Sequence, residues 1–324
     1  MSTGCPTCCS SSRATRTTCT AAATCCGTAM RSAWRRRRSF ALALLALLSV
    51  LPALAAAAAP ARICSVSLAG DEFLALLVPT DRVVCVSAWA DDEATSNVRG
   101  FYPERVLRVT AHVEPVLGQR PDLVLAAPWN SGEFLAQVRR SGIPVHVMRP
   151  VADLDEMRAE IRDLGRLLGV PDEARALIER LDRRVAALRA VVARARGPKP
   201  RVLSFSHLVV AGENTSVDTL IGLAGGINAA REIGVSGHRK VSLEAIVALD
   251  PDVLLLGFEP GRAAGDVLAA YPPLAATRAA REGRVVLLAP RLLTTVTPHL
   301  VEGARRLAEA LHPELAPIAL DDGR

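Results

Sequence analysis

The sequence predicts an α/β fold with two doubly wound lobes, and three observations lead to this prediction. Short apolar runs alternate with helical patterns through residues 61–150 and again through residues 201–324. A Glu seven residues before Pro-Asp, followed at once by an apolar run, occurs at residues 114–125 and again at 244–255. Between the two halves, apolar residues keep a helical period over residues 171–196. We therefore expect two similar half-molecules joined by a long helix.

The first 60 residues form a leader that precedes the fold. Residues 31–38 are strongly basic, residues 40–55 are apolar except for Ser49 and Pro52, and an alanine tract follows. This order is typical of a secretory signal peptide, here residues 30–59. The apolar run is shorter than the roughly 20 residues that a membrane-spanning helix needs, so a membrane anchor is the weaker interpretation. We expect an exported, periplasmic protein.

Two details concern the export route. The context of the next cysteine, Pro-Ala-Arg-Ile-Cys at residues 60–64, matches a lipoprotein signal poorly, so a soluble product is favoured. Arg37 and Arg38 partly resemble a twin-arginine signal, but a run of four Arg also gives this pattern by chance. The general secretory route and the twin-arginine route both stay open.

Residues 1–29 fit no signal and are rich in Ser, Thr, Ala and Cys. We interpret them as a start-site artefact, with translation beginning at Met30. The alternative is a metal-binding cluster formed by Cys5, Cys8, Cys9, Cys19, Cys25 and Cys26. Their spacing contains no second pair at the separation of known zinc sites, so we expect no metal site.

The positive charge of the chain belongs to its leader. The whole chain carries +6, with a pI near 9.1. The first 60 residues hold seven Arg and no acid, so the remainder has 32 basic and 33 acidic residues and a formal charge of −1. This balance gives no support for a nucleic-acid partner.

The first lobe is expected over residues 61–150. Its apolar runs lack the alternation of a half-exposed strand, which is typical of a parallel sheet covered on both faces. We expect helices at residues 71–77, 113–117 and 133–140, and strands at residues 63–67, 83–87, 123–126 and 145–148.

Two cysteines remain outside the leader, Cys64 and Cys85, one in each of the first two strand-like runs. In a doubly wound sheet these runs are neighbouring parallel strands. A disulfide in an oxidising compartment is one interpretation. Two buried free thiols are the other, and we favour it at this stage.

Residues 151–200 are expected to be helical. One helical period runs from Leu154 to Leu168, and Pro171 suits the start of a second helix, which continues to Arg196. About 25 residues at a rise of 1.5 Å give a rod of roughly 37 Å, long enough to cross from one lobe to another. A strict heptad pattern is not sustained, which disfavours a coiled-coil partner helix.

The second lobe is expected over residues 201–324. We expect strands at residues 202–205, 253–256 and 285–288, and helices at residues 217–224, 243–249 and 300–311.

A resemblance to a known family covers residues 62–313. Its pieces occur in order at residues 63–77, 83–89, 120–124 (Arg-Pro-Asp-Leu-Val), 225–230 (Gly-Gly-Ile-Asn-Ala-Ala), 241–244 (Val-Ser-Leu-Glu), 250–253 (Asp-Pro-Asp-Val) and 297–298 (Thr-Pro). In this order, behind a signal peptide, they resemble the type III periplasmic solute-binding proteins of ABC importers, which serve ferric siderophores, cobalamin and haem. The resemblance implies a ligand cleft between two lobes that move little, a monomer, and an importer permease and ATPase as partners.

In this family one Glu from each lobe docks into Arg pockets on the permease, and Glu114 and Glu244 match those positions. Two carboxylates on opposite lobes form a pair that Arg side chains can recognise together. The alternative is that each Glu only favours a helix N-terminus.

The cleft residues implied by the resemblance follow strand ends, where open α/β sheets bind ligands. Trp89 matches an aromatic position of the vitamin B12-binding member, and His238 stands where that member has a Trp. Ordinary loop packing is the alternative for Trp89, and exposed loop positions for the histidines. The full set is Trp89, Trp129, Asn130, His207, His238, Arg239, Thr294 and Thr295.

The expected ligand is a metal chelate, either a ferric siderophore or cobalamin. His238, Arg239 and Lys240 form a local positive patch that suits an anionic ferric chelate. Haem is the alternative; it needs an axial Tyr or His, and neither Tyr102 nor Tyr271 falls at an obvious ligand position.

An enzyme is the competing class, specifically a tetrapyrrole metal chelatase that uses His207 and His238. The signal peptide and the long helix disfavour it, and no nucleophile elbow, P-loop, zinc-protease or dinucleotide motif occurs. We expect a binding protein without catalysis and without a resident cofactor.

Overall fold

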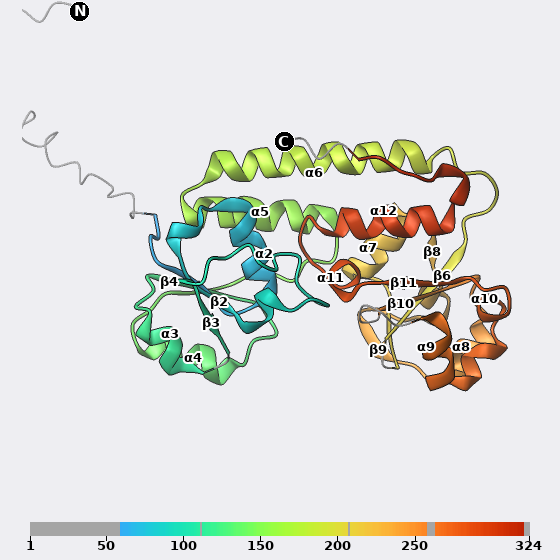
Figure 1. The fold of residues 1–324 in the computed structure, drawn as a ribbon, viewed down its shortest axis with the longest axis horizontal. Helices are drawn as coiled ribbons and strands as arrows, with labels where there is room; N and C mark the ends of the chain where they lie inside the picture. The colour runs from blue at the N-terminus through green and yellow to red at the C-terminus, as the bar shows by residue number, and fades with distance from the viewer. Residues whose placement is uncertain (1–58, 111, 207, 258–262, 321–324) are drawn as a thin grey trace, which may run out of the picture. The chain divides into compact units, whose positions relative to one another are not determined.

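The computed structural model describes residues 59–110, 112–206, 208–257 and 263–320. The Cys-rich stretch and the signal peptide, up to residue 58, lie outside the described residues. Residues 59–320 contain two α/β lobes, each built on its own sheet (Figure 1).

The N-terminal lobe is built on a five-stranded sheet in the order β3-β2-β1-β4-β5. All of its strand pairs are parallel. The central strands are buried, as their unbroken apolar sequences predict. The strands are β1 (Ile63–Ser65), β2 (Val83–Ser87), β3 (Leu107–Val109), β4 (Leu123–Ala126) and β5 (Val145–Val147).

Side-chain caps mark where the helices of this lobe begin. Ser67 accepts a hydrogen bond from the N–H of Gly70 at the start of α2, and Ser131 accepts one from Phe134 at the start of α4. α2 starts three residues earlier than predicted because of this cap. The helical segments are α2 (Leu68–Leu77), η1 (Thr80–Arg82), η2 (Ala88–Asp91), α3 (Val113–Gly118) and α4 (Gly132–Arg140).

Cys64 and Cys85 form a disulfide in the structure, rather than the two free thiols that we favoured from the sequence. They are register partners on the adjacent parallel strands β1 and β2, with a Cα–Cα distance of 4.6 Å. Such a bond links the central strand β1 to its neighbour β2 and persists in an oxidising compartment.

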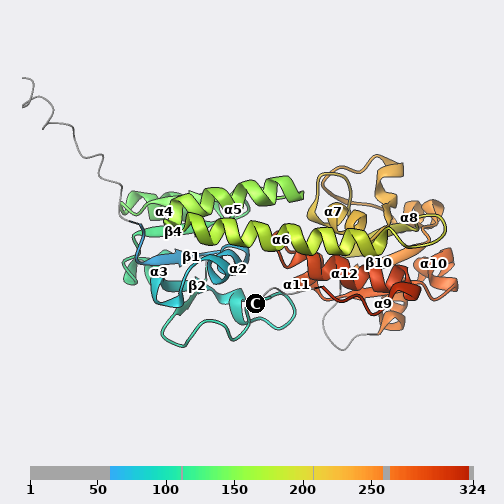
Figure 2. The ribbon, with the colours of Figure 1, turned by 90° about the horizontal axis from the view of Figure 1, so that it is seen from above.

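Two helices connect the lobes. α5 (Leu154–Leu168) is capped by Asp153 and ends at Gly169, which has a left-handed backbone. α6 (Pro171–Val192) packs against α2 of the first lobe and against α7 and α12 of the second (Figures 1 and 2). It ends four residues before the predicted Arg196.

The C-terminal lobe is built on a six-stranded sheet in the order β11-β10-β6-β7-β9, with β8 beside β6. It is mixed rather than wholly parallel, because β7 and β9 run antiparallel to their neighbours. The strands are β6 (Arg201–Ser206), β7 (Val209–Ala211), β8 (Ile227–Asn228), β9 (His238–Lys240), β10 (Val253–Gly257) and β11 (Val285–Leu288).

The helices of the second lobe cover its sheet. The helical segments are α7 (Ser216–Leu223), η3 (Ala229–Ile233), α8 (Leu243–Leu249), α9 (Ala264–Ala270), η4 (Pro272–Ala276), α10 (Arg278–Arg281), α11 (Pro290–Leu293), α12 (Leu300–Leu311) and η5 (Pro313–Leu315). None of the helices in the described ranges combines the length and the apolar character needed to cross a membrane.

One cluster of buried apolar side chains runs through both lobes. It includes Phe73 of α2, Leu181 of α6, and Leu307 of α12. Two smaller clusters fill the outer faces of the two sheets. The lobes and the helix between them therefore share a core, and this core fixes the edges of the cleft.

Candidate ligand cleft

A cavity of about 340 Å³ opens between the two lobes. The first lobe contributes most of its walls, and the C-terminal lobe contributes the segment after α11. Most of the lining is apolar, as is usual for small-molecule sites. The lining residues are Leu68, Ala69, Glu72, Trp89, Thr95, Trp129, Thr294, Thr295 and Val296.

Two tryptophans dominate the walls of this cavity. Trp89 lies on η2 directly after β2, and Trp129 lies in the loop after β4. Their exposed fractions are 61% and 64%, unusually high for the largest apolar side chain. Two exposed indoles in the lining of a concave site are suited to contact a flat or apolar ligand.

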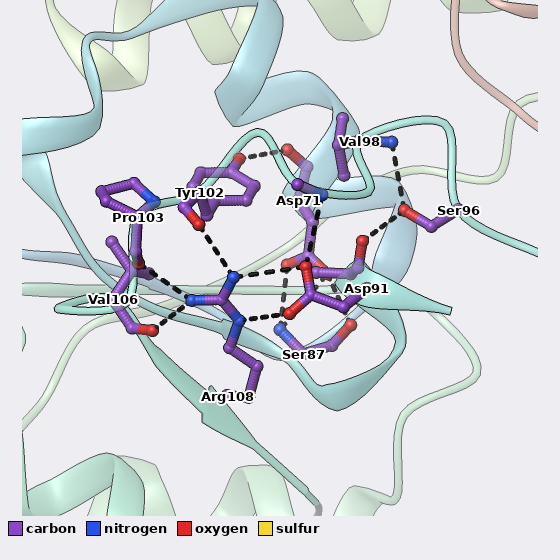
Figure 3. Close-up of polar contacts among 11 residues, drawn as sticks. Asp71, Ser87, Asp91, Ser96, Val98, Tyr102, Pro103, Val106 and Arg108 are labelled. Atoms are coloured by element: carbon purple, nitrogen blue, oxygen red, sulfur yellow. Dashed lines mark hydrogen bonds and ion pairs between the residues drawn. The ribbon is translucent and has the colours of Figure 1, made fainter. Parts of the chain in front are cut away.

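The segment that carries Trp89 is held by Arg108 of β3 (Figure 3). The guanidinium donates to the Asp91 carboxylate through Nε at 2.7 Å and Nη2 at 3.2 Å. It also donates to the carbonyl oxygens of Tyr102, Pro103 and Val106 at 2.6–3.0 Å. The hydrogen bonds between Arg108 and Asp91 lower the pKa of Asp91. All of these contacts hold Asp91, the last residue of η2, two residues from Trp89.

A second buried network anchors the start of the same segment (Figure 3). The Asp71 carboxylate accepts hydrogen bonds from the N–H of Ser87 at 3.1 Å and from its hydroxyl at 2.5 Å. Burial raises the pKa of Asp71 to about 7, although the hydrogen bonds oppose the shift. Ser87 is the residue that precedes η2, so this network also positions Trp89.

Glu72 lines the cavity and is a residue that the sequence analysis missed. Its side chain is buried, and Oε1 accepts hydrogen bonds from the Asn97 N–H at 3.2 Å and the Asn97 amide at 2.9 Å. Oε2 accepts hydrogen bonds from the hydroxyls of Thr295 at 3.0 Å and Thr297 at 2.6 Å. Of these four hydrogen bonds, the two from Thr295 and Thr297 join Glu72 of the first lobe to the second lobe.

Backbone groups continue this junction. The Asn97 amide donates to the Arg291 carbonyl at 2.6 Å, and the Arg291 N–H donates to the Ala94 carbonyl at 3.0 Å. The loop after η2 and helix α11 are thus tied together beside Thr95 and Thr294, which line the cavity. The signal for Glu72 in the sequence is an acid within the largely apolar run of α2, to which the sequence analysis assigned no role.

Four of the residues named from the sequence line the cavity: Trp89, Trp129, Thr294 and Thr295. Asn130 does not line it. The Asn130 side chain accepts a hydrogen bond from the Ala127 N–H at 2.7 Å and donates one to the Val66 carbonyl at 3.0 Å. The Asn130 side chain therefore joins the loops after β1 and β4, and it holds the loop that carries Trp129.

The other named residues lie elsewhere. His238 and Arg239 are exposed on the edge strand β9 and do not line this cavity. His207 lies outside the described residues, so its place in the cleft stays a prediction.

The tyrosines considered as haem ligands are engaged elsewhere. Tyr102 is 3% exposed, and its hydroxyl donates to the Asp71 carbonyl at 2.5 Å. Tyr271 packs edge-on against Phe205 in the core of the second lobe. Within the described ranges, no group of three or more His, Cys, Asp or Glu residues could hold a metal ion.

The two glutamates named for docking occupy equivalent places in the two lobes. Glu114 is in the first turn of α3 and Glu244 in the first turn of α8, and both are exposed. Helices α3 and α8 lie on the side of their lobes away from α6 (Figure 1). Hydrogen bonds from its own N–H and from the Ser242 hydroxyl lower the pKa of Glu244, which favours its charged form.

A family model described as a periplasmic binding protein matches residues 63–292. The chain belongs to this family. The family resemblance and the fold class predicted from the sequence, two α/β lobes joined by a long helix, are confirmed. Periplasmic binding proteins bind solutes, and their family name indicates an exported protein.

Several relatives of this periplasmic binding protein carry informative names. A cobalamin-binding protein of Halobacterium salinarum is 30% identical over 264 residues, which cover 78% of this chain and 70% of the relative. The ABC transporter substrate-binding lipoprotein YvrC of Bacillus subtilis, described as uncharacterised, is 25% identical, with 79% and 81% covered. The crystal structure of a periplasmic haem-binding protein from Pseudomonas aeruginosa is 29% identical, with 81% and 96% covered and a TM-score of 0.67.

Proposed function

We propose that this periplasmic binding protein is the substrate-binding component of an ABC importer that carries a metal chelate, cobalamin or a ferric siderophore. The observation that carries the proposal is the cavity between the lobes, walled by the exposed indoles of Trp89 and Trp129. A macrocycle or an aromatic chelate can stack on such surfaces. The Halobacterium salinarum relative, a cobalamin-binding protein by name, supports the same ligand class.

Haem is the second candidate, because a structural neighbour at 29% identity is a haem-binding protein by name. The lining supports it less well. No His, Tyr, Cys or Met is among the described residues that line the cavity. Haem iron needs an axial ligand from the protein, whereas cobalamin and ferric siderophores supply the ligands of their own metal.

We further propose that the chelate passes to a membrane permease, with its ATPase, through docking of Glu114 and Glu244. Their exposure, their matching first-turn positions and their placement on opposite lobes support this role. Delivery in the periplasm is supported by the Cys64–Cys85 disulfide, which suits an oxidising compartment.

Titration of the purified chain tests the ligand class. Cobalamin, ferric catecholate and hydroxamate siderophores, and haem are added separately, and binding is followed by tryptophan fluorescence and calorimetry. We expect saturable sub-micromolar binding of one chelate, with most of the quenching lost in Trp89→Phe and Trp129→Phe. The titration uses residues 61–324, whose only tryptophans are Trp89 and Trp129, so the fluorescence reports on the cleft. Absence of binding by all of these chelates would overturn the proposed function.

A further inference from the structure

We propose that the cleft prefers a chelate with amide side chains on its periphery to a chelate with carboxylates there. Amides supply hydrogen-bond donors and carry no negative charge. The inference rests on the proposed function and narrows its substrate class. It follows from the charge and the hydrogen-bonding state of the groups that line the cavity.

The first step concerns charge. Glu72 is the only charged side chain among the described residues that line the cavity, and it is negative. It is 2% exposed and is held by four hydrogen bonds, so it cannot turn away from an approaching ligand. A ligand carboxylate entering the cavity would meet this charge without a cation among the described lining residues to offset it.

Three sources of positive potential lie near the cavity. The N-terminal end of α2 borders the cavity through Leu68 and Ala69, and Asp71 in the first turn accompanies its partial positive charge. Arg239 and Lys240 lie on the exposed edge strand β9, and Arg291 lies on α11, three residues before Thr294; none of these side chains lines the cavity. None of the three sources therefore provides a salt bridge for a ligand carboxylate from the described lining.

The second step concerns the threonines. Each lining threonine donates its hydroxyl proton to an acceptor within the protein: Thr95 to Asp92 at 2.7 Å, Thr294 to the Pro290 carbonyl at 2.9 Å, and Thr295 to Glu72 at 3.0 Å. A hydroxyl that donates to the protein has only lone pairs left for a ligand. Thr95 and Thr294 therefore present acceptors to the cavity, whereas the Thr295 oxygen already accepts a hydrogen bond from the Thr297 N–H at 3.2 Å.

The third step concerns the ligand side chain that satisfies such a surface. The two indole N–H groups are the side-chain donors of the described lining, and the threonine oxygens and Glu72 are its acceptors. A carboxamide can accept from an indole and donate to a threonine at the same time. A carboxylate only accepts, so it leaves the threonine oxygens without a partner and adds an unpaired charge.

A corrinoid with its amide side chains fits these requirements, and haem with its two propionates does not. The decisive experiment compares two ligands with the same macrocycle on the unmodified protein: cyanocobalamin and its monocarboxylic acids, in which one peripheral amide is hydrolysed. We expect each monocarboxylic acid whose altered group enters the cleft to bind at least about ten-fold more weakly at pH 7.5, with haem weaker still.

Two variants locate the effect. Glu72→Gln removes the charge at nearly constant shape, and we expect it to reduce the ratio of the two dissociation constants several-fold. Thr294→Val removes one exposed acceptor and should weaken binding of the amide form about three- to ten-fold, whereas the control Thr294→Ser retains binding.

The outcomes separate this inference from the proposed function. Equal affinity for every amide–carboxylate pair, or tighter binding of haem, would overturn the charge selection and leave the binding function in place. Failure to bind any chelate would overturn both. Because the ligand comparison uses the unmodified protein, misfolding of a variant cannot obscure the result.

Discussion

Two neighbouring acids of α2 illustrate how adjacent residues acquire separate roles. The Asp71 carboxylate faces the interior of the first lobe and fixes Ser87, ahead of η2. The Glu72 carboxylate reaches Thr295, 223 positions away in the sequence, and joins the lobes. Successive side chains of a helix point about 100° apart. Asp71 can therefore position the segment that carries Trp89, while the adjacent Glu72 lines the cleft.

Asp71 makes the stability of the protein depend on pH. Its pKa is about 7 in the fold against 3.8 for an ordinary Asp, so the folded state holds its proton more strongly. The stabilisation from this proton is complete below pH 3.8 and is lost as the pH rises to about 7. One pKa unit corresponds to about 1.4 kcal/mol, so the total is on the order of a few kcal/mol.

We therefore expect Asp71→Asn to raise the free energy of unfolding at pH 8 by on the order of 1–3 kcal/mol and to flatten its decline between pH 4 and 7. Urea unfolding of both proteins at several pH values measures this. The exposed Asp172, in the first turn of α6, offers a control, since Asp172→Asn should leave the pH dependence intact. An Asp71→Asn protein with the same pH dependence as the unmodified protein would contradict the assignment.

Single residues differ in how well the sequence predicts them. Trp89 and Trp129 follow strand ends, and because strand ends face ligand sites in open sheets, their place beside the cavity follows from local pattern. Glu72 has no such local signal, since its partners come from the other lobe. Asn130 was predicted to line the cleft, and it does lie in the loop beside the cavity. Its amide instead forms hydrogen bonds with the backbone of Ala127 and Val66, which only the folded strands bring together.

At the level of elements, the longer apolar strands and the amphipathic helices were predicted well, whereas the short strands β3, β7, β8 and β9 were missed. The four predicted strands of the first lobe contain β1, β2, β4 and β5. Edge strand β9 was missed because its three residues, His-Arg-Lys, are exposed and carry no apolar pattern. α6 ends at Val192, and its last fully buried apolar residue is Leu188. Residues 193–196 were predicted to be helical, but they bury little apolar surface, so packing does not stabilise a longer helix.

The packing of α5 on α6 depends on a glycine. Gly165 lies within α5, and a methyl group there would overlap the side chain of Ala174 on α6. We expect Gly165→Ala to lower the free energy of unfolding by about 1–3 kcal/mol, despite the higher helix propensity of Ala. Thermal and urea denaturation provide the measurement.

Gly222 is the matched control for this substitution. It also lies in a helix, α7, but nothing stands within 4 Å of the position of an added methyl group. Gly222→Ala should therefore be neutral or stabilise by up to about 1 kcal/mol. Equal effects of the two substitutions would show that α5 and α6 do not pack as closely as described.

At the scale of residues 59–320, the lobes are joined by more than the long helix. One buried apolar cluster continues through both lobes, and Glu72, Asn97 and Arg291 add hydrogen bonds beside the cleft. The Thr219 hydroxyl of α7 also donates to the Ala152 carbonyl at 2.9 Å. We expect such a junction to resist large lobe movement, so that a partner would recognise a nearly fixed spacing of surface charges.

This fixed spacing gives the docking proposal its test. Glu114 and Glu244 are exposed and lie outside the cavity, so replacing both with Ala should leave the dissociation constant for the chelate within about two-fold. Transport should fall at least about ten-fold, because the Arg side chains of the permease would lose both carboxylates. Uptake of labelled chelate by cells, together with titration of the purified variant, measures the two effects.

A second pair of glutamates makes this test specific. Glu133 and Glu173 are also exposed in the first turns of helices, α4 and α6, so Glu133→Ala with Glu173→Ala removes the same charge and the same dipole interaction. We expect this control to transport at the normal rate. Normal transport by the Glu114→Ala, Glu244→Ala protein would exclude docking through these residues. An equal loss in the control would instead assign the effect to net charge, and the repeated Glu would then serve only its own helix.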